Sequence, residues 1–264
     1  MAVNGKIDMQ AGLTKVVEKA WSAFEGAAEF DSRATPAIPI LFFGDLDAYF
    51  RSPLRVVTVG LNPSLEEFPA DNPFLRFPAA EWIDTGDQTQ YLEALSAYFH
   101  KAPYSRWFSS FEPLLKGLGA SYYAGMPSTA LHTDICSPVA TNPTWSGLED
   151  DERKALEANG GLLWHDLLEV LIPQLVVLSV ARHHLERIRF SARGNWRDIN
   201  IFKQKSNGDE RRRPYKVSAR SYIVGTDPGL FVFCRAGLVP LMEIGTLQKR
   251  ELGEIILREL ANGR

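Results

Sequence analysis

The sequence predicts an α/β protein: a three-layer α/β/α sandwich in which a central parallel sheet of four strands lies between two layers of helices. Short apolar runs that are typical of buried strands alternate four times with segments of helical spacing. The chain has 264 residues, 45% of them hydrophobic and 23% charged, which is enough for a core without disulfides. Because neither an internal repeat nor a linker stands out, we predict one domain over residues 1–264.

The first predicted element is a helix near the N-terminus. Its apolar residues recur at helical spacing and would face a core: Leu13, Val16, Val17, Ala20, Trp21 and Phe24. Similar patterns predict helices over residues 91–99, 107–118, 162–171 and 181–189, and a last helix over residues 246–260. Pro173 ends the helix predicted over residues 162–171, because proline cannot continue a helix.

Four apolar runs predict strands, over residues 55–59, 129–135, 175–180 and 230–234. The first run is β-branched and leads directly into the turn Gly60-Leu-Asn-Pro63. Residues 194–221 interrupt the alternation and contain Asn207-Gly208, a pair typical of tight hairpin turns. We therefore predict an inserted hairpin or loop at about residues 190–221.

Charge is distributed unevenly along the chain. Residues 182–220 contain twelve Lys or Arg against four Asp or Glu, a net charge of +8, which leaves −11 for the remainder. Such segregation creates a positive surface and favours a polyanionic partner such as nucleic acid. A basic loop that only contacts solvent is the alternative.

Several classes of protein do not fit this composition. Two distant cysteines, Cys136 and Cys234, cannot form a four-thiolate zinc site or an iron–sulfur cluster. The sequence also contains no apolar run of membrane-spanning length and no signal-peptide pattern at its start. We expect a cytoplasmic protein with no metal, no cofactor and no membrane contact.

Unusual residues follow the predicted strands at their carboxyl ends, where open parallel sheets place their ligands. Gly60-Leu-Asn-Pro-Ser64 follows the first strand, Asp134-Ile-Cys-Ser-Pro138 follows the second and Cys234-Arg-Ala-Gly-Leu238 follows the fourth. The chain contains no phosphate-binding GxxxxGK[ST], no GxGxxG and no GxSxG. These observations disfavour common nucleotide-binding sites and serine hydrolases.

The segment Val56-Val-Thr-Val-Gly-Leu-Asn-Pro-Ser64 resembles the first motif of the uracil-DNA glycosylase superfamily, whose branches carry Gly-x-Asn-Pro or Gly-x-Asp-Pro after the first core strand. A weaker resemblance extends over about residues 40–260. It implies a uracil-DNA-glycosylase-like fold and an enzyme that removes a base flipped out of double-stranded DNA. No obligate protein partner is implied.

The resemblance also assigns roles to particular residues. An aromatic residue about a dozen positions past the motif stacks on the flipped base, and Phe74 and Phe77 are the candidates. Asp134 falls near the Asn that reads the base edge. The last motif of the family is usually His-Pro-Ser, whereas Cys234-Arg235-Ala236 stands here. The usual stabiliser of the leaving base is therefore missing.

Base removal hydrolyses an N-glycosidic bond, so a site must position a water molecule and stabilise negative charge on the leaving base. Asn62 can orient the water, and Arg235 can stabilise the base. Leu238 or Leu241 can fill the vacated stack as an apolar wedge. The expected phosphate-binding residues are basic: Arg182, Arg193, Arg211, Arg212, Arg213 and Lys216.

Two positions bear on which base is removed. The uracil-selective branch carries a bulky Tyr where this chain has Ser64, so the C5 edge of the base is left open. An ionised Asp134 can only accept hydrogen bonds, and the cytosine N4 amine is its natural partner. Together they favour a C5-modified cytosine, hydroxymethylated or glucosylated as in some phage DNA, and a role in antiviral defence. The alternatives are uracil or mismatch repair, an inactive nucleic-acid-binding module, and a hydrolase of small nucleosides.

Other polar residues receive simpler interpretations. Glu66 and Glu67 are expected to be surface charges, although one of them could help to orient a water molecule. His183 and His184 are interpreted as solvated or DNA-facing, and His132 as a packed core histidine.

Overall fold

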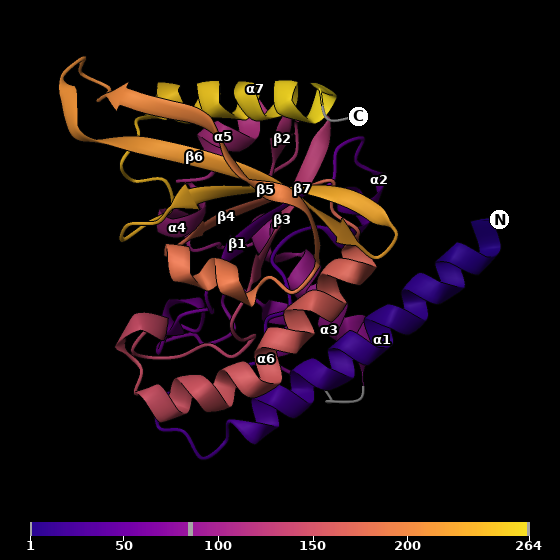
Figure 1. The fold of residues 1–264 in the computed structure, drawn as a ribbon. Coiled ribbons are helices and arrows are strands. Elements are labelled where there is room, and N and C mark those ends of the chain that lie inside the picture. The colour runs from indigo at the N-terminus through magenta and orange to yellow at the C-terminus, as the bar shows by residue number, and fades with distance from the viewer. Residues whose placement is uncertain (1, 84–86, 263–264) are drawn as a thin grey trace. The chain divides into compact units, whose positions relative to one another are not determined.

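The computed structural model describes residues 2–83 and 87–262 and has a mixed α/β fold (Figure 1). Its contacts divide the chain into two compact units whose segments alternate along the sequence. Unit 1 comprises residues 1–45, 60–103 and 132–171, and unit 2 comprises residues 46–59, 104–131 and 172–264. This alternation explains why the sequence shows no linker, since no single cut separates the units.

Among the described residues the sheet has seven strands instead of the four that were predicted. Its order is β2 (Ala120–Ser121), β3 (Ser128–Asp134), β1 (Val56–Gly60), β4 (Leu175–Val180), β7 (Asp227–Arg235), β6 (Glu210–Val224) and β5 (Ser191–Gln204). The pairs β1–β4 and β4–β7 are parallel, whereas β5 and β6 are antiparallel additions. The four predicted strands are therefore correct, and the extra width comes mainly from the hairpin.

The hairpin is part of the sheet and not a separate excursion. Strand β6 pairs with β7 from Val217↔Cys234 to Val224↔Asp227, and the β5–β6 turn contains Gly208 at φ 89°. In Figure 1 the two strands form the long orange arms. Residues 190–221 thus continue the sheet through antiparallel pairing. The alternation of strands and helices along the sequence does not predict this pairing.

Helices of unit 1 pack around an apolar interface between α1 (Ala2–Gly26) and α6 (Asp150–Leu171), which lie side by side in Figure 1. Gly12 permits the close approach, because a Cβ there would lie 2.8 Å from Val170 Cγ2. Helix α6 begins twelve residues before the predicted start, in an acidic first turn that favours a helix N-terminus. Unit 1 also contains α3 (Gln88–Ser96) and the 3₁₀ turns η1 (Leu65–Glu67), η2 (Pro78–Ala80), η3 (Tyr98–His100) and η4 (Trp145–Gly147).

Unit 2 contains α2 (Leu46–Arg51), α4 (Ser105–Phe108), α5 (Glu112–Gly117), η5 (Arg182–Arg187) and α7 (Thr246–Asn262). Helices α5 and α7 touch through two glycines, since a Cβ on Gly117 would lie 2.1 Å from the Arg250 carbonyl oxygen. The helix predicted over 107–118 is interrupted, with Pro113 in the first turn of its second half. The predicted helix 181–189 is wrong in type, because this segment is the 3₁₀ helix η5.

Among residues 2–83 and 87–262, no helix combines the length and the apolar character needed to cross a bilayer.

Candidate functional site: a buried carboxyl cluster

The loops that follow β1 and β3 are hydrogen-bonded to each other within unit 1. The Ile135 N–H donates to the Gly60 carbonyl over 3.1 Å, and the Cys136 N–H donates to the Leu61 carbonyl over 2.9 Å. Further along, the Thr141 N–H donates to the Pro63 carbonyl. The loops after the first two predicted strands therefore lie together, whereas the predicted loop after the fourth strand belongs to unit 2.

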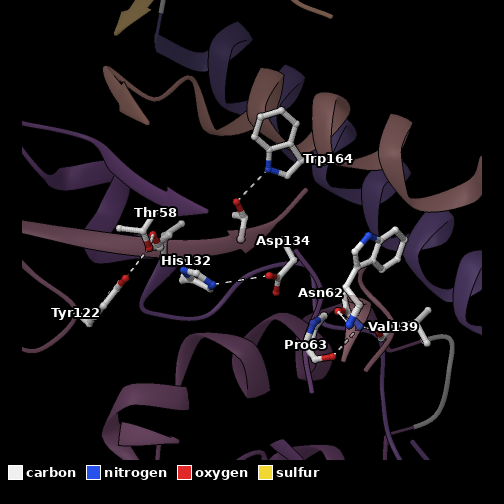
Figure 2. A network of polar contacts seen from close by, with 11 residues as sticks. Thr58, Asn62, Pro63, Tyr122, His132, Asp134, Val139 and Trp164 are labelled. Atoms are coloured by element: carbon white, nitrogen blue, oxygen red, sulfur yellow. Dashed lines mark hydrogen bonds and ion pairs between the residues drawn. The ribbon is translucent and has the colours of Figure 1, made fainter. Parts of the chain in front are cut away.

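Asn62 holds these loops together through both ends of its amide (Figure 2). Its Nδ2 group lies 2.9 Å from the Pro63 carbonyl, 3.2 Å from the Val139 carbonyl and 2.8 Å from Thr141 Oγ1. Its Oδ1 accepts from the Trp145 N–H over 3.2 Å, which leaves one lone pair of a carbonyl oxygen for a further donor. Asn62 thus has a structural task that sequence reasoning did not foresee.

Asp134 ends β3, and its side chain points toward His132 (Figure 2). Its side chain is 5% exposed, and its Oδ1 lies 3.8 Å from His132 Nε2. Gly60 makes room for it, because a Cβ at that position would lie 2.5 Å from Asp134 Oδ1. The carboxyl group of Asp134 therefore occupies space that only glycine in β1 leaves open.

Burial controls the ionisation of this pair. Loss of water raises the pKa of Asp134 well above its usual value, and repulsion from Glu67 raises it further. Burial also lowers the pKa of His132 to about 3, so the imidazole is neutral and does not compensate a carboxylate. Both effects favour the neutral acid, whereas the interpretation from the sequence takes Asp134 as an ionised group that only accepts hydrogen bonds.

Glu67 is a second buried carboxyl group, and the interpretation of this residue as a surface charge is wrong. It is 4% exposed, and burial raises the pKa of Glu67 to about 7. The Tyr98 hydroxyl, 2.6 Å from Glu67 Oε2, and the Arg76 guanidinium, 3.7 Å from the same oxygen, partly oppose that rise. Glu67, Tyr98 and Arg76, with Asp134 and His132, form what we call the carboxyl cluster.

The two candidate stacking residues differ in accessibility. Phe77 is 0% exposed and packs among Phe43, Phe68 and Tyr98, with ring centroids 5.2–6.4 Å apart. It is a core residue and cannot receive a base in this conformation. Phe74 is half-buried, at 6.3 Å from the Phe68 ring, and remains a candidate.

Ser64 is half-buried at the start of η1, in an extended conformation with φ −102°. It forms a bridge with Thr141, and no side-chain cap is formed there.

The residues predicted after the fourth strand lie in unit 2. Arg235 ends β7 and forms a bidentate pair with Glu243, at 2.8 Å from Nε to Oε1. Its positive charge is therefore already partnered. Leu241 is fully buried and cannot act as a wedge, whereas Leu238 is 83% exposed.

The basic residues of the hairpin also lie in unit 2. A hollow of about 390 Å³ lies among them, and one carboxylate, Glu243, is part of its lining. The basic residues that line it are Lys205, Arg211, Arg212, Arg213 and Arg235. Arg211 is held by the Gln204 and Glu243 carbonyls, whereas Arg212 and Arg213 are exposed. Of the other predicted cations, Arg182 and Arg193 are exposed, and Lys216 lies 3.3 Å from Asp198 Oδ2.

Sequence reasoning missed most of the carboxyl cluster. Tyr98 and Arg76 were not considered, and Glu67 lies only five residues after Asn62. The 3₁₀ turn Leu65–Glu67 buries Glu67 and exposes Glu66. A shift of one residue in such a turn changes which of the two side chains faces the core. His184 is similarly buried beside the exposed His183, so the interpretation of both as solvated is half wrong.

Within the part of the chain that the structure describes, no group of three or more His, Cys, Asp or Glu side chains is arranged to hold a metal ion. Comparison of the chain with models of known protein families and with curated proteins finds no match.

Proposed function

We propose that the protein is a DNA glycosylase that hydrolyses the N-glycosidic bond of a flipped pyrimidine and leaves an abasic site. We also propose that its helices and central sheet form three layers, as in uracil-DNA glycosylases. The observation that carries the proposed activity is the protonatable Asp134 at the carboxyl end of a sheet strand, beside the Asn62 loop. Ligands of open α/β sheets bind at this edge.

A neutral Asp134 is suited to pyrimidine recognition. A carboxylic acid presents one donor and one acceptor side by side. Cytosine offers the matching N4 donor and N3 acceptor, and uracil offers the O4 acceptor and N3 donor. An ionised Asp134 matches only the N4 amine, so the protonation state of this residue sets the base that it accepts.

The same proton supports the chemistry. As the bond between C1′ and the base nitrogen breaks, the bonding electrons move to the base and the sugar becomes oxocarbenium-like. Asp134 donates its proton or a hydrogen bond to the departing base, and water adds to C1′ and releases a proton. Asn62 Oδ1 accepts from this water through its remaining lone pair. Glu67 acts as a positioning residue, because its charge adds to burial in raising the pKa of Asp134.

DNA would be held mainly by the hairpin. Its exposed cations, Arg212 and Arg213 among them, bind phosphates irrespective of sequence. Leu238 would fill the vacated stack, and Phe74 would stack on the flipped base. Since Arg235 is paired with Glu243, its contribution to the leaving base requires that this ion pair opens.

For the base, we propose a C5-modified cytosine, such as hydroxymethylcytosine or its glucosylated form in phage DNA, and hence a defensive role. Ser64 supports this choice, because a small side chain leaves the C5 edge open. Uracil is the second candidate, and the raised pKa of Asp134 favours it more than the sequence does.

The test uses duplex DNA containing uracil, hydroxymethylcytosine or glucosylated hydroxymethylcytosine, followed by cleavage at abasic sites. We expect wild-type protein to release the modified cytosine. Asp134→Ala should abolish release. At a pH above the pKa of Asp134, where the wild-type carboxylate only accepts hydrogen bonds, Asp134→Asn should shift preference toward uracil. Ser64→Tyr should exclude bases with large C5 groups and spare unmodified ones.

Asp151→Asn is the matched control, because Asp151 lies in the same unit and its side chain is 98% exposed. Thermal unfolding of each variant verifies the fold. Release of uracil alone would contradict the modified-cytosine proposal. DNA binding without release of any base would contradict the glycosylase and leave a nucleic-acid-binding module.

A further inference from the structure

A second hollow, of about 700 Å³, lies entirely within unit 2 between η5 and the β5–β6 hairpin. This volume falls within the range of about 300–1,000 Å³ that is usual for small-molecule sites. Its lining combines aromatic and cationic side chains, and the residues used below are Arg182, Glu186, Phe190, Trp196, Arg220 and Tyr222. None of them belongs to the carboxyl cluster or to the Asn62 loop.

Trp196 and Phe190 are the half-buried aromatic residues among those that line this hollow, whereas Tyr222 is buried, and Trp196 has the larger ring. The β5–β6 register shifts between Arg193 and Arg197, and Gly194 adopts φ 71° within that shift. Such a bulge redirects the side chains that follow it. The indole is half-buried and packs edge-to-face on Tyr222 and Phe233, with interplanar angles of 61° and 72° and centroids 6.1 and 6.3 Å away. A ring held in this way can receive a flat ligand with little loss of conformational entropy.

Two arginines are held beside these rings. The Arg220 guanidinium lies 5.2 Å from the Tyr222 ring centroid and donates from Nε to the Gly194 carbonyl over 2.9 Å. The Arg182 guanidinium lies 5.6 Å from the Phe233 ring centroid. Each guanidinium has five N–H donors, so these interactions leave donors for an anion. Glu186 is the single carboxylate among the lining residues.

Aromatic rings with adjacent arginines match a nucleotide better than other ligands. An apolar ligand would leave two cations without a partner, and a free phosphate would not use the indole. A nucleotide satisfies both, since its base stacks on an aromatic ring and its phosphate pairs with guanidinium groups. Arg193 lies on the same strand, and the surrounding residues 182–220 carry a net charge of +8, which favours a longer polyanion over a single nucleotide.

We propose that this hollow binds an unpaired nucleotide of a nucleic-acid strand, with the base stacked on Trp196 and the phosphates paired with Arg182 and Arg220. This subsite deepens the proposed DNA partner, and it requires no base excision. A strand that is locally opened, as base flipping demands, would present such a nucleotide.

The experiment measures the affinity of the full chain for a fluorescent twelve-residue oligothymidylate by anisotropy. Trp196→Ala should weaken binding about fivefold or more, because stacking on one base contributes about 1–3 kcal/mol. Trp196→Phe should restore most of the affinity. Trp82→Ala is the matched control, because Trp82 is 80% exposed in unit 1, and it should bind like wild type.

Arg182→Ala is a second variant, and it changes an exposed side chain. The slope of log affinity against log salt concentration should become less steep by about 0.7. Unchanged oligothymidylate affinity in both Trp196→Ala and Arg182→Ala would overturn the proposal. So would equal affinity for thymidine monophosphate and for the oligomer, since the ligand would then be a free nucleotide. Excision assays on duplex DNA are run in parallel. Oligomer binding that depends on Trp196 in a protein without excision activity would overturn the glycosylase alone.

Discussion

Glu67 and Asp134 in unit 1 are carboxyl groups with almost no exposed surface, whereas Arg212 and Arg213 in unit 2 are cations open to solvent. In the carboxyl cluster, packing decides which groups carry charge, because burial raises the pKa of both acids. In the hairpin, charge is simply displayed, and surface charges contribute little to stability. Burying the acids therefore costs folding free energy in unit 1, while the exposed arginines of unit 2 are a source of long-range electrostatic field.

Two asparagines in loops provide the strongest contrast. Asn62→Ala removes the partners of the Val139 carbonyl and the Trp145 N–H, and we expect the unfolding free energy to fall by about 2–4 kcal/mol. Asn207→Ala, in the exposed hairpin turn, removes bonds to Asp209 and should change it by less than about 1 kcal/mol. Urea unfolding measures both. Equal effects would mean that the Asn62 loop is not a rigid part of the site.

The pH dependence of stability isolates the buried acids. The pKa of Glu67 rises from its usual 4.5 to about 7, so the folded state binds more protons than the unfolded state between these values. The unfolding free energy should therefore fall as pH rises through that window. Glu67→Gln should reduce this slope and stabilise the protein at pH 8 by about 1–3 kcal/mol.

Glu81→Gln is the control for this experiment, because Glu81 is exposed in the same unit. It should leave the slope as in wild type. A Glu67→Gln variant with an unchanged slope would show that Glu67 ionises like a surface group.

Base preference should also depend on pH, if the proposed function holds. Below the pKa of Asp134, the neutral acid matches both cytosine and uracil, and above it the carboxylate repels uracil O4. The ratio of uracil to cytosine-type excision should therefore fall with rising pH, by a discrimination of about 1–3 kcal/mol. Single-turnover rates on the two substrates measure this ratio, and the Asp134→Asn variant should show no such pH dependence.

The smallest effect on stability is expected in the hairpin. Replacing Arg212 and Arg213 together with Ala should shift the unfolding free energy by no more than about 0.5 kcal/mol. Duplex DNA affinity should fall for every sequence, and the plot of log affinity against log salt should flatten by about 0.9 for each phosphate that the protein no longer neutralises. Arg211 is left in place because it binds backbone carbonyls. An unchanged salt slope would show that the pair faces only solvent.

The buried strands were predictable because their signal is local. Residues 175–180 are apolar throughout and form β4 with the predicted bounds, and the stripe from Leu13 to Phe24 lies within α1. The hairpin strands escaped prediction as sheet members, since Arg-rich segments exposed on one side lack a continuous apolar run. Their place in the sheet is set by pairing with β7, which is a tertiary contact.

For the candidate site, the order of the predicted strands located the sheet edge where the site lies, but it did not predict which side chains there are buried or ionised. The loops after β1 and β3 were predicted to converge, and they are hydrogen-bonded. The pKa of Asp134 could not be foreseen, because it depends on burial and on Glu67, 67 residues away in sequence. Phe77 and Leu241 were misassigned for a related reason: exposure distinguishes Phe77 from Phe74, and Leu241 from Leu238, and spacing does not encode exposure.

The alternation of the two units along the chain has a consequence for how the protein is made. All three segments of unit 1 have been synthesised by residue 171, whereas unit 2 still lacks residues 172–264. At about 5–20 residues per second, the ribosome needs roughly 5–20 s for that remainder, which is long compared with the folding of most small domains. We therefore expect the acids to be enclosed during translation, before the hairpin has been synthesised.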